Sequence, residues 1–194
     1  MKTYPINEIF YSLQGEGYFT GTPAVFVRFY GCNLQCPFCD TRQSHLEHLS
    51  EEAILQEVGK FPARLVVLTG GEPSLFVTPS LLEGLHRLRK FVAIETNGTH
   101  ALPEGLDWVT LSPKDRFVDR AAVCLTHCDE LKVVFTGDEV PAYAEIAARH
   151  HFLQPCDTGD AAANARLLQG AIRWVKAHPD WRLSLQTHKI TGIR

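Results

Sequence analysis

The chain has 194 residues, 45% of them hydrophobic, which suits one well-packed domain spanning residues 1–194. Its formal charge of −3 offers no basic surface of the kind that binds nucleic acid, so a small-molecule substrate is expected instead. No apolar stretch is long enough to cross a bilayer, and residues 1–5 lack the features of a signal peptide. We therefore expect a cytoplasmic protein without a membrane partner, whose six cysteines bind metal rather than form disulfides.

The hydrophobic pattern predicts strands that alternate with helices. Residues 6–17, taken alone, favour an N-terminal arm that ends in a Gly-rich turn. Strands are predicted at residues 24–29, 65–68, 91–94, 108–111, 131–135, 152–153 and 183–186, and helices at residues 51–59, 79–88, 142–149 and 161–177. Ser50 and Thr78 are suited to cap the first two helices. This alternation is typical of an α/β fold with a mainly parallel sheet, whose ligands lie beyond the carboxyl ends of the strands.

The segment GCNLQCPFCDT, residues 31–41, directly follows the first predicted strand. It holds Cys32, Cys36 and Cys39, which are separated by three and then two residues. Three thiolates on one irregular loop can each bind one iron of a 4Fe-4S cluster and leave the fourth iron without a protein ligand. Zinc is the main competing metal, but a structural zinc site needs four ligands, and His45 and His48 are poorly placed to supply one. The spacing favours an iron-sulfur cluster with an open iron.

Polar turns also end the later predicted strands. They are TGGEP at residues 69–73, ETNGT at 95–99, SPK at 112–114 and QPCD at 154–157. Each is explained on its own by a strand-ending turn. Because all of them fall at the same edge of a parallel sheet, together they predict a ligand-binding edge. Lys114 is the strongest candidate, since a cation beside a proline-stiffened strand end suits a carboxylate or hydroxyl.

The cysteine spacing resembles that of the radical S-adenosylmethionine enzymes. The resemblance implies an abridged, partly open (β/α) barrel in which adenosylmethionine chelates the open iron and is cleaved to a 5'-deoxyadenosyl radical. An electron donor such as flavodoxin would reduce the cluster. The residues implied to bind the cofactor are Phe38, Gly71, Glu72, Gly98, Ser112, Pro113, Lys114, Gln154, Pro155, Cys156 and Asp157.

Longer segments resemble the 7-carboxy-7-deazaguanine synthase family. The most specific are FYSLQGEG at residues 10–17, ETNGT at 95–99, LSPK at 111–114 and QTHK at 186–189. The resemblance implies conversion of 6-carboxy-5,6,7,8-tetrahydropterin into 7-carboxy-7-deazaguanine with loss of ammonia, a step of queuosine and 7-deazapurine biosynthesis. It implies that the substrate is bound by Leu13, Gln14, Gly15, Arg28 and Thr96, and that Thr41 binds Mg²⁺.

Two other functions stay open on the sequence. One is an activase that generates a glycyl radical on a partner protein, which would share the cysteine loop and the GGEP turn. The other is a non-catalytic iron-sulfur or zinc protein with four closed metal ligands. An open barrel edge also makes a homodimer plausible.

Several residues carry no assigned role at this level. Glu16, His188 and Lys189 are candidates for a general acid or base. Cys124 and Cys128, which share a three-residue gap, are interpreted as surface and core thiols because no fourth ligand accompanies them. The terminal sequence TGIR departs from the apolar or proline-containing end that the family often has, so the resemblance does not extend to a contact of that end with the substrate.

Overall fold

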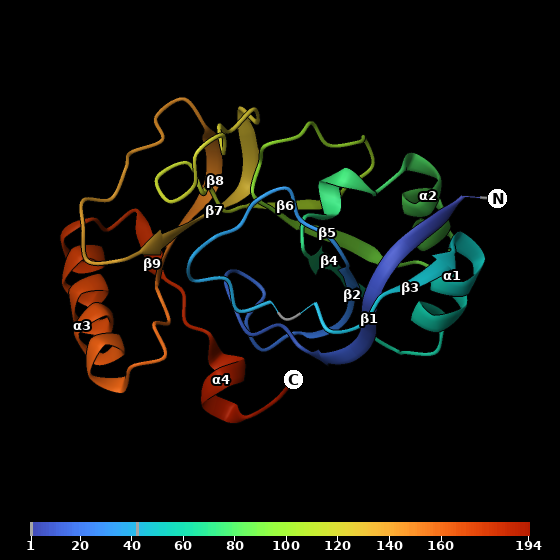
Figure 1. Cartoon of the computed structure of the whole chain (residues 1–194), viewed down its shortest axis with the longest axis horizontal. Helices are drawn as coiled ribbons and strands as arrows, with labels where there is room; N and C mark the ends of the chain where they lie inside the picture. Colours follow the sequence, from blue (N-terminus) through green and yellow to red (C-terminus); the bar gives the residue numbers. More distant parts are fainter. Residues whose placement is uncertain (1, 42) are drawn as a thin grey trace.

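The structure is a computed structural model that describes residues 2–41 and 43–194, and all the strands of these residues belong to one open sheet (Figure 1). Its strand order is β3-β1-β2-β4-β5-β6-β7-β8-β9. The strands are β1 (Thr3–Leu13), β2 (Pro23–Phe29), β3 (Glu47–Ser50), β4 (Leu65–Gly70), β5 (Phe91–Thr96), β6 (Trp108–Leu111), β7 (His127–Phe135), β8 (Ala147–Pro155) and β9 (Trp181–Leu183). The run from β2 to β9 is parallel throughout, which confirms the predicted α/β fold with a mainly parallel, unclosed sheet.

The first strand, β1, corrects the prediction of an N-terminal arm. It pairs antiparallel with β2 along one edge and with β3 along the other. Its sequence carries Pro5, and its register shifts between Ile6 and Glu8, so the alternation that marks a strand is interrupted. The pairing partners on both sides supply the hydrogen bonds that local sequence does not predict.

The helices begin at side-chain caps. In α1 (Glu51–Gly59) the Ser50 hydroxyl accepts from the Ala53 N–H at 3.2 Å, and in α2 (Pro79–Arg87) Thr78 accepts from Leu81. The helix α3 (Ala161–Ala177) has the predicted bounds, and a short α4 (Thr187–Thr191) and a 3₁₀ turn η1 (Pro73–Leu75) complete the set. None of the helices in the described part of the chain is long and apolar enough to cross a membrane.

The helix predicted at residues 142–149 is wrong. Residues 147–155 instead form β8, which pairs in parallel with residues 127–135 of β7. Tyr143 adopts a left-handed φ of 44° and donates its hydroxyl to Asp115 at 2.7 Å, which is incompatible with a continuous helix. The last strand also lies earlier than predicted, at Trp181–Leu183 instead of residues 183–186.

The sheet is packed on both faces. Helices α1 and α2 cover one part of it and bury Ile54, Leu81 and Leu85 against β2, β4 and β5, while α3 covers β7 and β8 at the opposite end (Figure 1). A smaller cluster around Phe10, Phe26 and Trp108 lies in a separate part of the core. Burial on both faces explains why the central strands read as continuous apolar runs.

Truncation of Leu85 tests the packing of α2. Its side chain is fully buried, so Leu85→Ala should lower the free energy of unfolding by about 2–5 kcal/mol through lost burial and the cavity left behind. Leu88→Ala removes the same atoms from a residue that is 40% exposed at the end of the same helix, and should cost much less. Urea unfolding monitored by circular dichroism measures both. Equal losses would contradict the described packing.

Candidate active site

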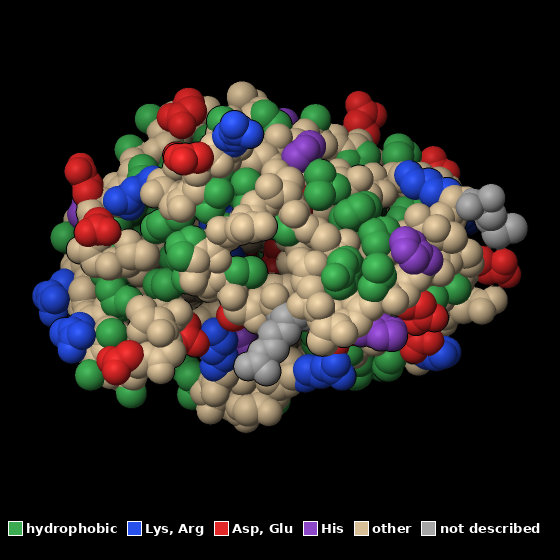
Figure 2. Space-filling view, in the orientation of Figure 1, with side chains coloured by type: hydrophobic (Ala, Val, Ile, Leu, Met, Phe, Trp, Pro, Cys, Tyr) green, Lys and Arg blue, Asp and Glu red, His purple; other side chains and the backbone are tan. Residues whose placement is uncertain are grey.

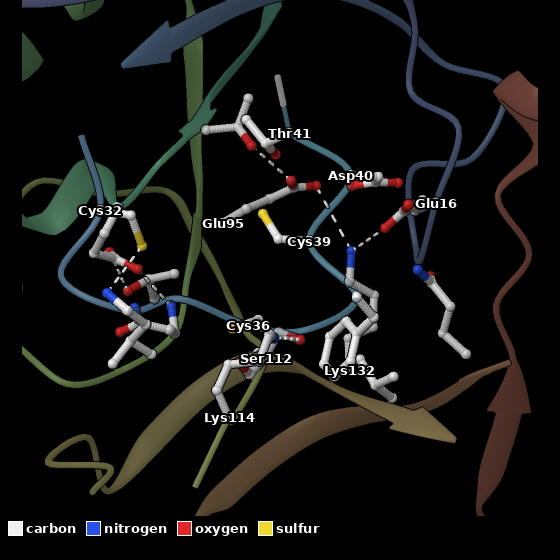
Figure 3. Close-up of a pocket in the computed structure, with 18 of the residues that line it drawn as sticks. Glu16, Cys32, Cys36, Cys39, Asp40, Thr41, Glu95, Ser112, Lys114 and Lys132 are labelled. Carbon is white, nitrogen blue, oxygen red and sulfur yellow. Dashed lines mark hydrogen bonds and ion pairs between the residues drawn. The ribbon is translucent and has the colours of Figure 1, made fainter. Parts of the chain in front are cut away.

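A cavity of about 220 Å³ lies at the carboxyl ends of strands β4 to β8. Figure 2 shows this cavity as a hollow near the middle of the view, with Asp or Glu side-chain atoms visible at its bottom. The cysteine loop forms one wall, the strand-ending turns form another, and charged side chains from inside the sheet form the floor (Figure 3). The predicted site residues that line it are Cys32, Cys36, Phe38, Cys39, Thr41, Gly71, Glu72, Thr96, Ser112, Lys114, Gln154, Pro155, Cys156 and Asp157.

The cysteine loop is held by contacts with residues far away in the sequence. Asn33 donates from its amide to the Thr99 hydroxyl at 2.8 Å and accepts from the Asn97 amide at 3.1 Å. The Gly31 N–H donates to the Gln43 side chain at 2.8 Å, in a left-handed conformation (φ 102°) that favours glycine. The loop therefore takes its position from the turn that follows β5.

The three thiols fit an iron-sulfur cluster better than a single metal ion. All three are free and face the same cavity, and Cys32 and Cys39 are exposed. Burial raises the pKa of Cys32 and of Cys36. Within residues 2–41 and 43–194, no three His, Cys, Asp or Glu side chains converge as the ligands of one ion would. Thiols spread around one space suit a cluster in which each binds a different iron.

The GGEP turn presses against the cysteine loop and ties it to β5. A Cβ at Gly71 would lie 1.9 Å from the Gly31 carbonyl oxygen, so only glycine fits there. The next side chain, Glu72, is 1% exposed and accepts hydrogen bonds from the Thr96 hydroxyl and the Asn97 N–H, both at 2.7 Å. This buried carboxylate fixes two strand-ending turns relative to each other.

Two further strand-ending turns, at residues 112–114 and 154–157, complete this wall of the cavity. The Lys114 ammonium donates to the carbonyl oxygen and the hydroxyl of Ser112, at 2.7 and 2.6 Å, and burial lowers its pKa to about 8. At the end of β8, the Gln154 side chain accepts from Ser184 at 2.7 Å. Asp157 accepts from Lys189 at 2.8 Å, and this bond holds the pKa of Asp157 well below its usual range.

The floor of the cavity is formed by charged side chains around Lys132, a residue for which the sequence predicted no role. Lys132 projects from β7 between Glu16 and Glu95, and its ammonium lies 2.5 Å from Glu16 and 3.8 Å from Glu95 (Figure 3). The Lys132 side chain is 8% exposed. A signal existed, because Glu130 and Lys132 are charged residues two apart in one strand and so share one face.

Six of the predicted site residues lie outside the lining of this cavity. They are Leu13, Gln14, Gly15, Arg28, Gly98 and Pro113. Gln14 is just behind the floor, where its amide donates to Glu95 at 3.0 Å. Arg28 lines a neighbouring hollow, where it pairs with Glu8 at 2.9 Å. That hollow shares Asp40 and Thr41 with the main cavity, so the two spaces adjoin.

The remaining cysteines agree with their interpretation as surface and core thiols. Cys124 is exposed, whereas Cys128 is buried in β7, and burial raises the pKa of Cys128 to about 12. Cys156 is also buried, but it lies at the cavity wall.

Known proteins resemble this chain in sequence and in fold. Residues 26–117 match the Radical SAM superfamily. A 7-carboxy-7-deazaguanine synthase from Bacteroides thetaiotaomicron is 51% identical, over 97% of this chain and 98% of that protein. One from Haemophilus influenzae is 38% identical, over 98% of this chain and 94% of that protein. The crystal structure of QueE from Escherichia coli is similar with a TM-score of 0.76 at 30% identity, over 96% of this chain and 95% of that one.

The three-cysteine loop at the mouth of an open parallel sheet, together with these matches, defines a radical S-adenosylmethionine enzyme, a class that uses a 4Fe-4S cluster and adenosylmethionine. Within this class the chain belongs to the 7-carboxy-7-deazaguanine synthase family. Its relatives do not favour the glycyl-radical activase or the non-catalytic metal protein.

Substitution of Gly71 tests the contact between the GGEP turn and the cysteine loop. Gly71→Ala forces a Cβ against the Gly31 carbonyl, and such overpacking typically costs about 1–3 kcal/mol. We expect less iron per chain after anaerobic reconstitution than in the unmodified protein. Gly59→Ala is the matched control, since its Cβ would meet nothing closer than 3.9 Å. Full iron content in Gly71→Ala would contradict the contact.

The ion pair of Glu16 predicts a specific dependence of stability on pH. Burial opposes ionisation, but attraction to Lys132 outweighs it and lowers the pKa of Glu16 from 4.5 to about 2. A lowered pKa stabilises the fold above pH 4.5, and this contribution is lost as the pH falls toward 2. The difference in free energy of unfolding between the unmodified chain and Glu16→Gln should therefore be constant from pH 5 to 7 and shrink below pH 4.5. A constant difference down to pH 2.5 would refute the assignment.

Proposed function

We propose that this chain converts 6-carboxy-5,6,7,8-tetrahydropterin into 7-carboxy-7-deazaguanine with loss of ammonia. The observation that carries the proposal is that one cavity has three free thiols at its mouth and a row of carboxylate and ammonium groups at its floor. A polar heterocycle rich in N–H and C=O groups finds both acceptors and donors on such a floor. The family to which the chain belongs supports the same reaction.

When bound, the cluster and adenosylmethionine supply the radical chemistry that removes a hydrogen atom from C6 of the substrate. We propose that Cys32, Cys36 and Cys39 hold the cluster and leave one iron free. The cofactor would then lie along the wall formed by the strand-ending turns. The proposed cofactor-binding residues are Phe38, Gly71, Glu72, Gly98, Ser112, Pro113, Lys114, Gln154, Pro155, Cys156 and Asp157.

Their surroundings support different contributions to that wall. Gly71 lets the backbone approach closely, because no side chain would fit between the GGEP turn and the cysteine loop. Phe38 packs edge-to-face on Phe117, with 4.8 Å between ring centroids, which gives a flat apolar surface for a base. Glu72 and Gly98 act through the backbone arrangement, since Glu72 is satisfied by Thr96 and Asn97 and Gly98 lies in a left-handed turn.

The substrate side is proposed to comprise Leu13, Gln14, Gly15, Arg28 and Thr96. Gln14 and Gly15 belong to the loop that closes the floor. The Gln14 peptide is paired with Thr22 and Gly21 and the Gly15 carbonyl oxygen with Thr187, which holds this loop beside the proposed position of the pterin ring. Arg28 offers a guanidinium to the substrate carboxylate. Its pairing with Glu8 in the adjoining hollow keeps it oriented toward the space shared by Asp40 and Thr41.

A magnesium ion would bind where the two hollows adjoin. Thr41 lines both of them, and Asp40 lies beside it. One hydroxyl is a weak ligand, so water and the carboxylate oxygens of the substrate would have to supply the remaining ligands. Such an ion would couple recognition of the substrate carboxylate to the position of the reacting ring.

The proposal extends to partners and location. The exposure of Cys32 and Cys39 supports electron transfer from an external reductant such as flavodoxin. The exposed edges of the sheet at β3 and β9 are compatible with a homodimer, and a cytoplasmic location accords with thiols kept reduced.

The first experiment follows the reaction directly. The chain is reconstituted anaerobically with iron and sulfide, reduced with dithionite, and supplied with adenosylmethionine, Mg²⁺ and 6-carboxytetrahydropterin. We expect mass spectrometry to show a product lighter than the substrate by one ammonia. Cys36→Ala should abolish it because one iron loses its ligand, whereas Cys124→Ala, at an exposed thiol outside the cavity, should leave it unchanged. Cleavage of adenosylmethionine with the pterin untouched would leave the class intact and remove the substrate assignment.

A further inference from the structure

Lys132 lies at the centre of three carboxylates inside the sheet. Its ammonium is 2.5 Å from Glu16 and 3.8 Å from Glu95, and the charge of Glu130 also acts on it. Burial alone would lower the pKa of Lys132, but the attraction of these carboxylates raises it well above the ordinary value. The lysine is therefore charged at any working pH.

The carboxylate closest to Lys132 belongs to a loop and not to the sheet. Glu16 lies in residues 14–17, which we call the floor loop, directly after β1. The Glu16 side chain reaches Lys132 of β7 with one carboxylate oxygen, and its other oxygen accepts from Gln186 at 3.0 Å. The Gly17 N–H donates to Ser184 at 3.0 Å. The floor loop therefore crosses the interior of the open sheet toward the edge formed by β9.

The packing around the floor loop leaves no room for a side chain at Gly15 or Gly17. A Cβ at Gly17 would lie 2.0 Å from Glu130, and one at Gly15 would lie 2.3 Å from His188. The amide of Tyr18 donates to Glu130 at 3.1 Å. Glu130 is 2% exposed and one of its oxygens has no partner within the described residues, so this region already contains poorly compensated negative charge.

We propose that Lys132 is the positioning residue of the floor loop: through Glu16 it holds residues 14–17 closed over the cavity floor in the arrangement that receives the substrate. The inference rests on the proposed function, since these residues are the proposed binding surface for the pterin. Lys132 acts through Glu16 and Glu95, and it is not assigned a step of the chemistry.

The physical reason is the cost of a buried charge without a counter-ion. If Lys132 is removed, Glu16 and Glu95 face Glu130 with no ammonium between them. A carboxylate left buried and unpaired strongly destabilises the arrangement that buries it. Because Glu16 is on a loop, the floor loop can swing out to hydrate that carboxylate while the strands stay in place. The cofactor wall, built on other residues, should be little affected.

The test measures the floor loop without requiring turnover. Hydrogen–deuterium exchange of a peptide covering residues 14–18 is followed in the reconstituted chain for Lys132→Met, Lys132→Arg and the control Lys60→Met, whose lysine is 63% exposed and pairs only locally with Glu57. In Lys132→Met we expect exchange to accelerate about tenfold or more, equivalent to about 1.4 kcal/mol of lost protection. Lys132→Arg keeps the charge and should stay within about threefold of the unmodified chain. Lys60→Met should show the same exchange rate as the unmodified chain.

Kinetics supply the second readout. The KM for 6-carboxytetrahydropterin should rise about tenfold or more in Lys132→Met, because a displaced loop must be closed by the substrate itself. The rate of adenosylmethionine cleavage without pterin should stay within about twofold of the rate of the unmodified chain, because the cofactor wall does not use Lys132. If the unmodified chain fails to convert the pterin, the proposed function falls while the exchange experiment still decides the role of Lys132.

A double variant keeps the inference falsifiable. Glu16→Gln in the Lys132→Met background removes the unpaired charge and should restore part of the lost protection, which a purely steric role of Lys132 would not allow. If Lys132→Met does not fold, the single variant Glu16→Gln tests the proposal instead. Loss of the ion pair in that variant should also speed hydrogen exchange of residues 14–18. Unchanged exchange in Lys132→Met or in Glu16→Gln, or effects that simply add in the double variant, would overturn the proposal.

Discussion

The ion pair between Lys132 and Glu16 compensates for a sheet that does not close. A closed barrel covers its own interior, but here β3 and β9 are separate edges and the interior is open on one side. The loop after β1 crosses that opening, and the buried ammonium of Lys132 links it to β7. The enzyme thus replaces missing barrel strands with one loop and one charge. The replacement makes the cavity floor polar, which suits the proposed pterin substrate.

The mouth of the cavity is held in place in a different way from its floor. The cysteine loop has few regular hydrogen bonds of its own, and its position comes from Gly71, Asn97 and Thr99. These residues lie on turns after β4 and β5, and Glu72 joins the two turns through buried hydrogen bonds. The three cysteines proposed to hold the cluster are therefore positioned by the ends of the sheet. Such a scaffold can remain rigid while the loop itself stays irregular enough to wrap a cluster.

Local signals predicted much of this architecture and part of the site. The caps at Ser50 and Thr78 and the bounds of α3 follow from side-chain chemistry within a few residues, and the structure confirms them. The pairing of β8 with β7 does not, because residues 142–149 have helical composition and only the neighbouring strand makes the later part of them extended. The same limit hid the pairing of Lys132, although not its charge within a strand, since its partner Glu16 is 116 residues earlier in the chain. Interactions that close over long sequence separations leave no local pattern to read.

The helix α4 and the residue before it link parts of the chain that are made at very different times. Gln186 donates to Asp40 across 146 residues, and Lys189 pairs with both Asp40 and Asp157. During synthesis the cysteine loop emerges long before these residues do, because domains form from the N-terminal side as the chain is made. The thiols consequently pass through a stage in which the wall beside them is missing. Asp40 and Asp157 therefore acquire their shared cation, Lys189, only when residue 189 has been made.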